Sequence, residues 1–229
     1  MIESAKILRE KAWADLSNKW SNASVLALVL WITYMFSYNL FIFQILIFPI
    51  YCSYPICFLL NHRGAQQALK TDMLGKGYKQ FARITTTMFL SFLYAFLWSL
   101  ALTGVFFCVG LLLDFKGTPM DSEYLYGWWI PFFLTYTYKQ IQYAMTPYIL
   151  HDYPYLSNNR AIKLSTQMMK GHIMKYIKLY LSFWPWWILV ICSLGIALLW
   201  LSPYAKAAEA IFYEQVKEEY ETKHASRYR

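Results

Sequence analysis

"FARITTTMFLSFLYAFLWSLALTGVFFCVGLLLDF", residues 81–115, decides the fold class of this 229-residue chain. It has almost no polar residues apart from Ser, Thr and Tyr, whose hydroxyls can bond back to a helical backbone. A helix needs about 20 mostly apolar residues to cross a bilayer core about 30 Å thick. A core helix of a soluble protein would instead carry polar residues at every third or fourth position. The stretch therefore predicts a membrane-spanning helix.

The composition supports the same class. Hydrophobic residues make up 58% of the chain and charged residues only 15%, against about 45 to 50% and about 25% in ordinary globular domains. A soluble core of this size cannot hide that excess. The net charge of +8 could suggest nucleic acid, but in a membrane protein basic residues first report orientation. We therefore expect membrane lipids as partners and no nucleic acid.

The apolar runs predict an all-α membrane bundle over residues 22–213, with six spans arranged as three hairpins. Tight turns are expected around Asn39 and at Cys192–Gly195. Each even-numbered span holds a proline, which leaves open an internal duplication or ordinary proline kinks. The expected spans are roughly 22–38, 40–60, 81–113, 126–150, 173–192 and 195–213.

The basic residues test this six-span layout. Six spans leave only one basic residue on the external side, Lys116, which lies among Asp114, Asp121 and Glu123. Five or seven spans would place one of the basic clusters on the external side of the membrane. The positive-inside rule then places both termini in the cytoplasm. The cytoplasmic segments would hold Lys6, Arg9, Lys11, Lys19, Arg63, Lys70, Lys76, Lys79, Arg83, Arg160, Lys163, Lys170, Lys175, Lys178, Lys217, Lys223, Arg227 and Arg229.

The two ends of the chain read as cytoplasmic segments. Residues 1–21 have the spacing of an amphipathic helix, which either lies in the membrane interface or packs on the cytoplasmic ends of the bundle. Residues 214–229 form a charged tail. This tail is either a solvated helical extension or a docking segment for a partner.

"MTPYILHDYPYLSNNRAIKLSTQMMKGH", residues 145–172, reads as a joint between the fourth and fifth spans. Pro147 removes a backbone donor, Ser157 can cap a new helix, and Gly171 can end it. Along that helix Arg160, Lys163 and Lys170 form a basic stripe, together with Gln167, opposite an apolar face. The stripe is expected to contact anionic lipid head groups, or else a phosphate-bearing ligand or a partner protein.

Charged residues inside the predicted spans form the second candidate site. Lys139 and Lys206 lie near the middle of their spans, and Glu209 follows Lys206 by one helical turn. Because a lone charge in the bilayer is costly, a pair between Lys139 and Glu209 is expected, assisted by Gln140 and Gln142. The cluster either joins helices or lines a polar cavity for a lipid head group or a small solute.

No motif for catalysis or cofactor binding is found. His151 precedes Asp152, but adjacent residues seldom face each other and a surface loop offers no enclosed pocket. The four cysteines lie in apolar runs without a CxxC pair, so no metal or disulfide is expected. The chain is expected to be a non-catalytic accessory, scaffold or assembly component. A lipid or small-solute transporter is the alternative, and a protein partner or homo-oligomer is compatible with either.

Five segments follow one another along the chain: "LREKAWADLSNKW", "MTPYILHDYPYLSNNRAIKLSTQMMKGH", "LYLSF", "SLGIALLWLSPY" and "AIFYEQV". In order and spacing they resemble domain-of-unknown-function family 975, an uncharacterised bacterial family of multi-pass membrane proteins. The matching residues are Pro147, Tyr148, Asp152, Pro154, Met169, Lys170, Gly171, Leu194, Gly195, Trp200, Pro203 and Tyr204.

The chain departs from the family pattern at Ala197, where a second glycine is usual. The resemblance implies a multi-pass fold in the bacterial inner membrane, and a distant similarity to the membrane portion of some glycerophosphodiester phosphodiesterases. It implies no catalytic residues.

Overall fold

The computed structural model describes residues 2–38, 41–65, 67–75, 80–113 and 129–225. Within these ranges the chain is helical and has no β-strand, as the sequence predicts. The helices are α1 (Ala5–Leu16), α2 (Trp20–Tyr38), α3 (Phe41–His62), α4 (Asp72–Gly75), α5 (Phe81–Leu113), α7 (Trp129–Tyr143), α8 (Thr146–Asp152), α9 (Asn158–Met169), α10 (Ile173–Leu181), α11 (Trp184–Cys192) and α12 (Leu198–Ala225).

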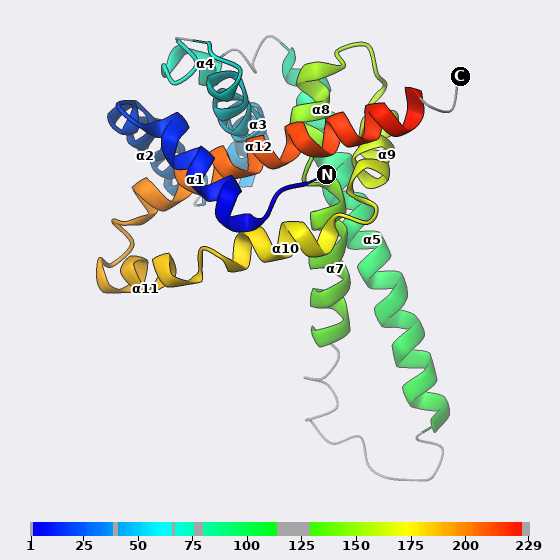
Figure 1. The fold of residues 1–229 in the computed structure, drawn as a ribbon. Helices are drawn as coiled ribbons and strands as arrows, with labels where there is room; N and C mark the ends of the chain where they lie inside the picture. The colour runs from blue at the N-terminus through cyan, green and yellow to red at the C-terminus, as the bar shows by residue number, and fades with distance from the viewer. Residues whose placement is uncertain (1, 39–40, 66, 76–79, 114–128, 226–229) are drawn as a thin grey trace.

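The molecule has two parts, which we call the body and the arm. The arm consists of α7 and the part of α5 beyond Ala95, and the two helices run side by side away from all the others (Figure 1). At its base, Ala95 and Tyr143 pack with Ile162 of α9 in a small buried cluster. Leu113 lies 18 residues beyond Ala95, which corresponds to about 27 Å of helix.

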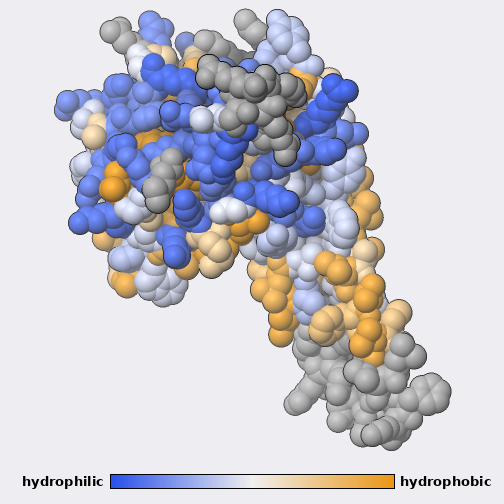
Figure 2. Space-filling model, turned by 45° about the vertical axis from the view of Figure 1, so that its right-hand side comes forward, coloured by the Kyte–Doolittle hydropathy of each residue, from blue (hydrophilic) through white to orange (hydrophobic). Residues whose placement is uncertain are grey.

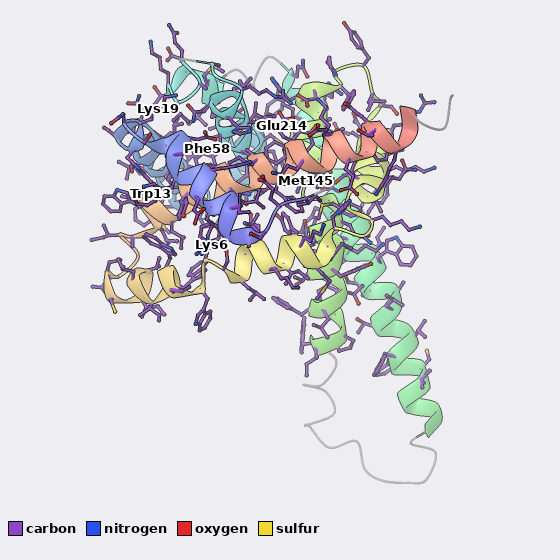
Figure 3. All side chains as sticks on the ribbon, viewed as in Figure 1. Lys6, Trp13, Lys19, Phe58, Met145 and Glu214 are labelled. Atoms are coloured by element: carbon purple, nitrogen blue, oxygen red, sulfur yellow. The ribbon has the colours of Figure 1, made fainter. Side chains whose placement is uncertain are left out.

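The body is organised around α12, which crosses it from one side to the other (Figure 1). Residues Ala207 to Tyr213 of α12 are all buried, and α1, α2 and α3 pack against this helix. Phe58 of α3 and Met145 before α8 lie inside the body (Figure 3), at 1% and 0% exposure. These apolar contacts form one continuous core.

The N-terminal helix α1 belongs to the body. Leu8, Ala12 and Leu16 recur at a spacing of four residues and are buried, and the helix packs along α12. On its other face Trp13 is 49% exposed and contacts the ring of Trp186 at 6.4 Å. α1 is therefore packed against the other helices of the body.

The six-span arrangement is not confirmed. Only Phe81–Val109, among the described residues, is a helix long and apolar enough to cross a membrane. The expected fifth span, 173–192, is divided into α10 and α11, nine residues each. The expected fourth span, 126–150, is divided into α7 and α8, and the helix of the expected sixth span, 195–213, continues to Ala225.

Two prolines account for the divided helices. Proline has no N–H to bond the carbonyl four residues earlier. Pro147 leaves the carbonyl of Tyr143 without this bond, and α7 ends at Tyr143. Pro185 does the same to Leu181, and α10 ends at Leu181. The helix break therefore falls four residues before each proline.

The predicted turns are observed where they are described. Gly171 and Gly195 both adopt positive φ, at 87° and 93°, and separate the helices on either side. Ser157 occupies the N-cap position of α9, although its side chain makes no capping hydrogen bond. Asn39 and the loop with Lys116 lie outside the described residues.

Candidate functional site

Asp152, the last residue of α8, is the buried centre of an ionic cluster. Nη1 and Nη2 of Arg63 each donate to one of its carboxylate oxygens, both at 2.7 Å. Lys217 Nζ donates to Oδ2 at 2.7 Å, and the hydroxyl of Tyr213 donates to the same oxygen at 3.0 Å. The Asp152 side chain is only 5% exposed. One carboxylate thus joins the C-terminal end of α3 and the middle of α12 to α8.

The charges of this cluster balance. Arg63 also donates through Nε to Glu214, so that two cations face two carboxylates. Glu214 lies on α12 (Figure 3). Burial raises the pKa of Asp152, but the hydrogen bonds from Arg63 and Lys217 outweigh burial and hold that pKa well below its usual range. The same hydrogen bonds stabilise the charged form of Arg63 and therefore raise its pKa. Asp152 and Arg63 therefore remain charged at neutral pH.

Arg83 of α5 binds the end of the same helix. Its Nη2 donates to the carbonyls of Tyr153 and Leu156, both at 3.0 Å, and its Nη1 to the carbonyl of Leu150 at 3.4 Å. A cation is favourable at a helix C-terminus because the last carbonyls carry partial negative charge. α8 is therefore held by α3, α5 and α12 together.

Glu209 forms a second buried cluster, inside the body. It is 2% exposed, and its Oε2 accepts a hydrogen bond from Lys206 Nζ at 2.6 Å. The hydroxyl of Tyr180 on α10 donates to the same oxygen. Tyr148 is fully buried and stacks on Tyr213 with 4.8 Å between ring centroids. Glu209 thus pairs with Lys206 of its own helix, α12.

Lys139 does not take part in that cluster, so the predicted pair with Glu209 is absent. Its Nζ lies 4.5 Å from the ring centroid of Trp98 on α5, and no ion pair of Lys139 is found within the described residues. The physical reason is the early end of α7 at Tyr143, which places Lys139 close to the base of the arm.

The two predicted glutamines are also apart from Glu209. The Gln140 side chain donates to the Tyr136 hydroxyl at 2.8 Å, within α7. The backbone carbonyl of Gln142 accepts from Ser165 of α9 at 2.8 Å. Both interactions stabilise the base of the arm, and neither lines a cavity with Lys206.

The basic stripe of α9 is exposed as predicted. Arg160, Lys163 and Lys170 all face outward, and no ion pair joins any of them to a described residue. The opposite face of α9 is buried against its neighbours through Ala161, Ile162, Ser165, Met168 and Met169.

The surface of the described residues also contains hollows, of which two lie beside the clusters. An open groove of about 550 Å³ runs between α7, α10 and α11 and is mostly apolar. A smaller cavity of about 200 Å³ lies between α3, α5 and α8, with Cys52, Cys57 and His151 in its wall. In the described ranges no three His, Cys, Asp or Glu side chains are grouped to hold a metal ion. The groove is lined by Thr137, Ile141, Tyr176, Ile177, Tyr180, Leu181, Trp184 and Trp187.

Residues 1–220, which include both body and arm, match the model of a family described as a protein of unknown function (DUF975). The chain belongs to this family. No curated protein and no solved structure matches the chain. The similarity to glycerophosphodiester phosphodiesterases therefore has no support from these comparisons, and the family description supplies no activity.

Sequence reasoning missed the role of Asp152. It considered this residue as part of the family motif and as a catalytic partner of His151, and it set the catalytic role aside. A signal was nevertheless present, because Asp152 is the only carboxylate between residues 145 and 172, where Lys and Arg occur at three positions. The partners Arg63 and Lys217 lie 89 and 65 residues away in sequence, so no local pattern could identify them.

Proposed function

We propose that the chain is an integral membrane protein whose arm crosses the bilayer while the body lies on the cytoplasmic side. The supporting observation is the surface of the arm, where large apolar side chains face outward. Val105, Phe106 and Phe133 are 60%, 68% and 70% exposed. Burying a side chain of this kind is worth about 1.5 to 3 kcal/mol, and apolar surfaces this continuous mark membrane or protein contacts.

The dimensions of the arm favour lipid over water. About 27 Å of α5 extends beyond Ala95, close to the hydrocarbon thickness of about 30 Å. Figure 2 shows the arm as mainly hydrophobic where it leaves the hydrophilic face of the body. Trp98 and Lys139 lie near the junction, where aromatic rings and the long side chains of lysine favour the membrane interface.

The orientation follows from the path of the chain. α5 leaves the body and α7 returns to it, so the residues before and after the arm lie on one side of the proposed membrane. That side carries Arg63, Arg83 and Lys217, which the positive-inside rule assigns to the cytoplasm. Both termini would then be cytoplasmic, in the inner membrane of a bacterium. Six spans are not part of this proposal, because α10 and α11 are too short to cross.

Cys108 provides the test. Cys108 is on the outward surface of α5, whereas Cys52 and Cys57 are buried in the body. In a protein with Cys52, Cys57 and Cys192 changed to Ala, a charged maleimide should leave Cys108 unmodified in native membranes and modify it after detergent is added. A matched variant, with Lys70→Cys as its one cysteine, should react in inside-out vesicles without detergent. Rapid reaction of Cys108 from water would contradict the proposal.

We propose a non-catalytic role, as an accessory or assembly component of an inner-membrane complex. The support is that the buried charges of the body bind one another. Arg63 and Lys217 are bound to Asp152, and Lys206 is bound to Glu209. In mild detergent the protein should purify in a complex of fixed stoichiometry. A lone monomer that retains only lipid would contradict this role.

The groove between α7, α10 and α11 supports a second candidate, the binding or transport of a lipid or small solute. Tyr180 forms part of its wall and donates to the buried Glu209. Ile177→Trp should fill the groove and reduce the lipid retained after purification. Ile188→Trp, on an exposed position of α11 outside the groove, is the matched control. Equal lipid retention in the two variants would exclude a role for the groove.

A further inference from the structure

We infer that the basic stripe of α9, formed by Arg160, Lys163 and Lys170, binds the anionic head groups of phospholipids in the membrane that the arm crosses. This inference rests on the proposed membrane location. It concerns one helix and one ligand class, and it can fail while the membrane location stands. Three features of the structure support it.

The first feature is that the cations of the stripe form no ion pair with the described residues, whereas several other cations of the body are bound within the protein. Arg63, Lys217 and Lys206 of the body are bound to carboxylates within the protein, and Arg83 and Arg9 donate to backbone carbonyls. The three cations of the stripe are exposed, and none forms an ion pair in the described part of the chain. Their charge is therefore available to an external anion.

The second feature is the firm attachment of α9. Ile162 packs with Ala95 and Tyr143, Ser165 donates to the carbonyl of Gln142, and the hydroxyl of Tyr94 donates to Asn159 at 3.2 Å. These contacts orient the helix, so its cations are presented without folding of a loop. Ordering a binding surface costs free energy when a ligand binds. Because α9 is already ordered by its contacts with α5 and α7, binding to the stripe does not carry this cost.

The third feature is the position of α9. The helix packs against both α5 and α7 at the base of the arm. If the arm beyond Ala95 lies in hydrocarbon, the base lies at the level of the head groups. A cation near an anionic membrane surface gains about 1 kcal/mol, which corresponds to about fivefold in affinity. A stripe of cations at this level is therefore complementary to anionic lipid more directly than to a soluble partner.

The experiment uses the whole protein in nanodiscs of phosphatidylcholine with a minor fraction of phosphatidylglycerol. The phosphatidylglycerol retained after extraction into detergent is measured by native mass spectrometry. Wild type should be enriched in phosphatidylglycerol, and Lys163→Gln/Lys170→Gln should lose about an order of magnitude of that preference. Salt should weaken the wild-type preference, because exposed charges are screened.

Lys6→Gln/Lys70→Gln is the matched control. It removes the same charge from two exposed lysines of the body that do not lie on α5, α7 or α9, and it should retain the wild-type preference. Equal loss in both variants, or no preference in wild type, would overturn the inference. Lys163→Gln/Lys170→Gln could instead keep the wild-type lipid preference and lose an acidic protein that co-purifies with wild type. That result would also overturn the inference, in favour of a protein partner. Cys108 protection remains a separate measurement, so failure of the stripe and failure of the membrane location are distinguishable.

Discussion

The body and the arm hold their helices together by opposite means. In the body, Asp152 joins α3, α8 and α12 through charged hydrogen bonds of 2.7 Å. In the arm, α5 and α7 meet through rings, with Phe96 and Phe132 at 5.8 Å between centroids. The body therefore depends on the pairing of its buried charges in addition to its apolar core, whereas the arm depends on the apolar medium proposed around it. Substitutions that remove or add one charge should separate these two kinds of stability.

The largest effect is expected from Asp152→Asn. The amide keeps the size of the side chain, but it leaves Arg63 and Lys217 partly buried without their shared carboxylate. Breaking a buried ion pair on one side costs about 3 to 5 kcal/mol. Thermal unfolding of the purified protein in detergent should show a large fall in Tm. Glu221→Gln is the control, because Glu221 accepts one hydrogen bond from Tyr153 at an exposed position, and its effect should stay below about 0.5 kcal/mol. Equal Tm values would show that the cluster does not hold the body together.

The same cluster predicts a pH dependence. The pKa of Asp152 is lower in the folded protein than in the unfolded chain, where it is about 3.9. The folded state therefore binds fewer protons in this range, and the stabilisation is complete above the unfolded value and lost as the pH falls towards the folded pKa. The Tm difference between wild type and Asp152→Asn should be constant from pH 7 to about pH 5 and shrink below about pH 4. A difference independent of pH would contradict the assigned charge.

In the arm, Phe106→Lys should act on membrane insertion and spare the body. Phe106 is 68% exposed and far along α5 from the body. A lysine at the centre of a spanning helix costs about 2.5 to 3.5 kcal/mol in insertion. The fraction of protein integrated in the membrane should fall, while Phe106→Ala should integrate normally. Normal integration of Phe106→Lys would place this part of the arm outside hydrocarbon.

The same contrast explains what sequence could predict. Apolar length and glycine position depend on local residues, so an all-helical chain and the turns at Gly171 and Gly195 were predicted correctly. The ends of α7 and α10 were also encoded locally, four residues before Pro147 and Pro185, but the spans were extended past them. The Asp152 cluster depends on residues distant in sequence that only the packing around α12 brings together.

Lys139→Leu should have the smallest effect, and it tests how the arm differs from the body. From sequence, Lys139 was expected to pair with a buried carboxylate, so that its loss would strand Glu209. In the structure it lies on the ring of Trp98, an interaction worth about 0.5 to 1 kcal/mol at exposed sites, and Glu209 keeps Lys206 and Tyr180. Lys139→Leu should therefore lower Tm by a few degrees or less, whereas Lys206→Leu should cost about 3 to 5 kcal/mol by leaving Glu209 unpaired. The two variants each remove one lysine, and their Tm values are measured in the same detergent. The difference between them isolates the effect of a buried carboxylate partner from the effect of the lysine charge itself. If both variants lost the same stability, Lys139 would have a carboxylate partner in the folded protein, and the base of the arm would have to be packed differently.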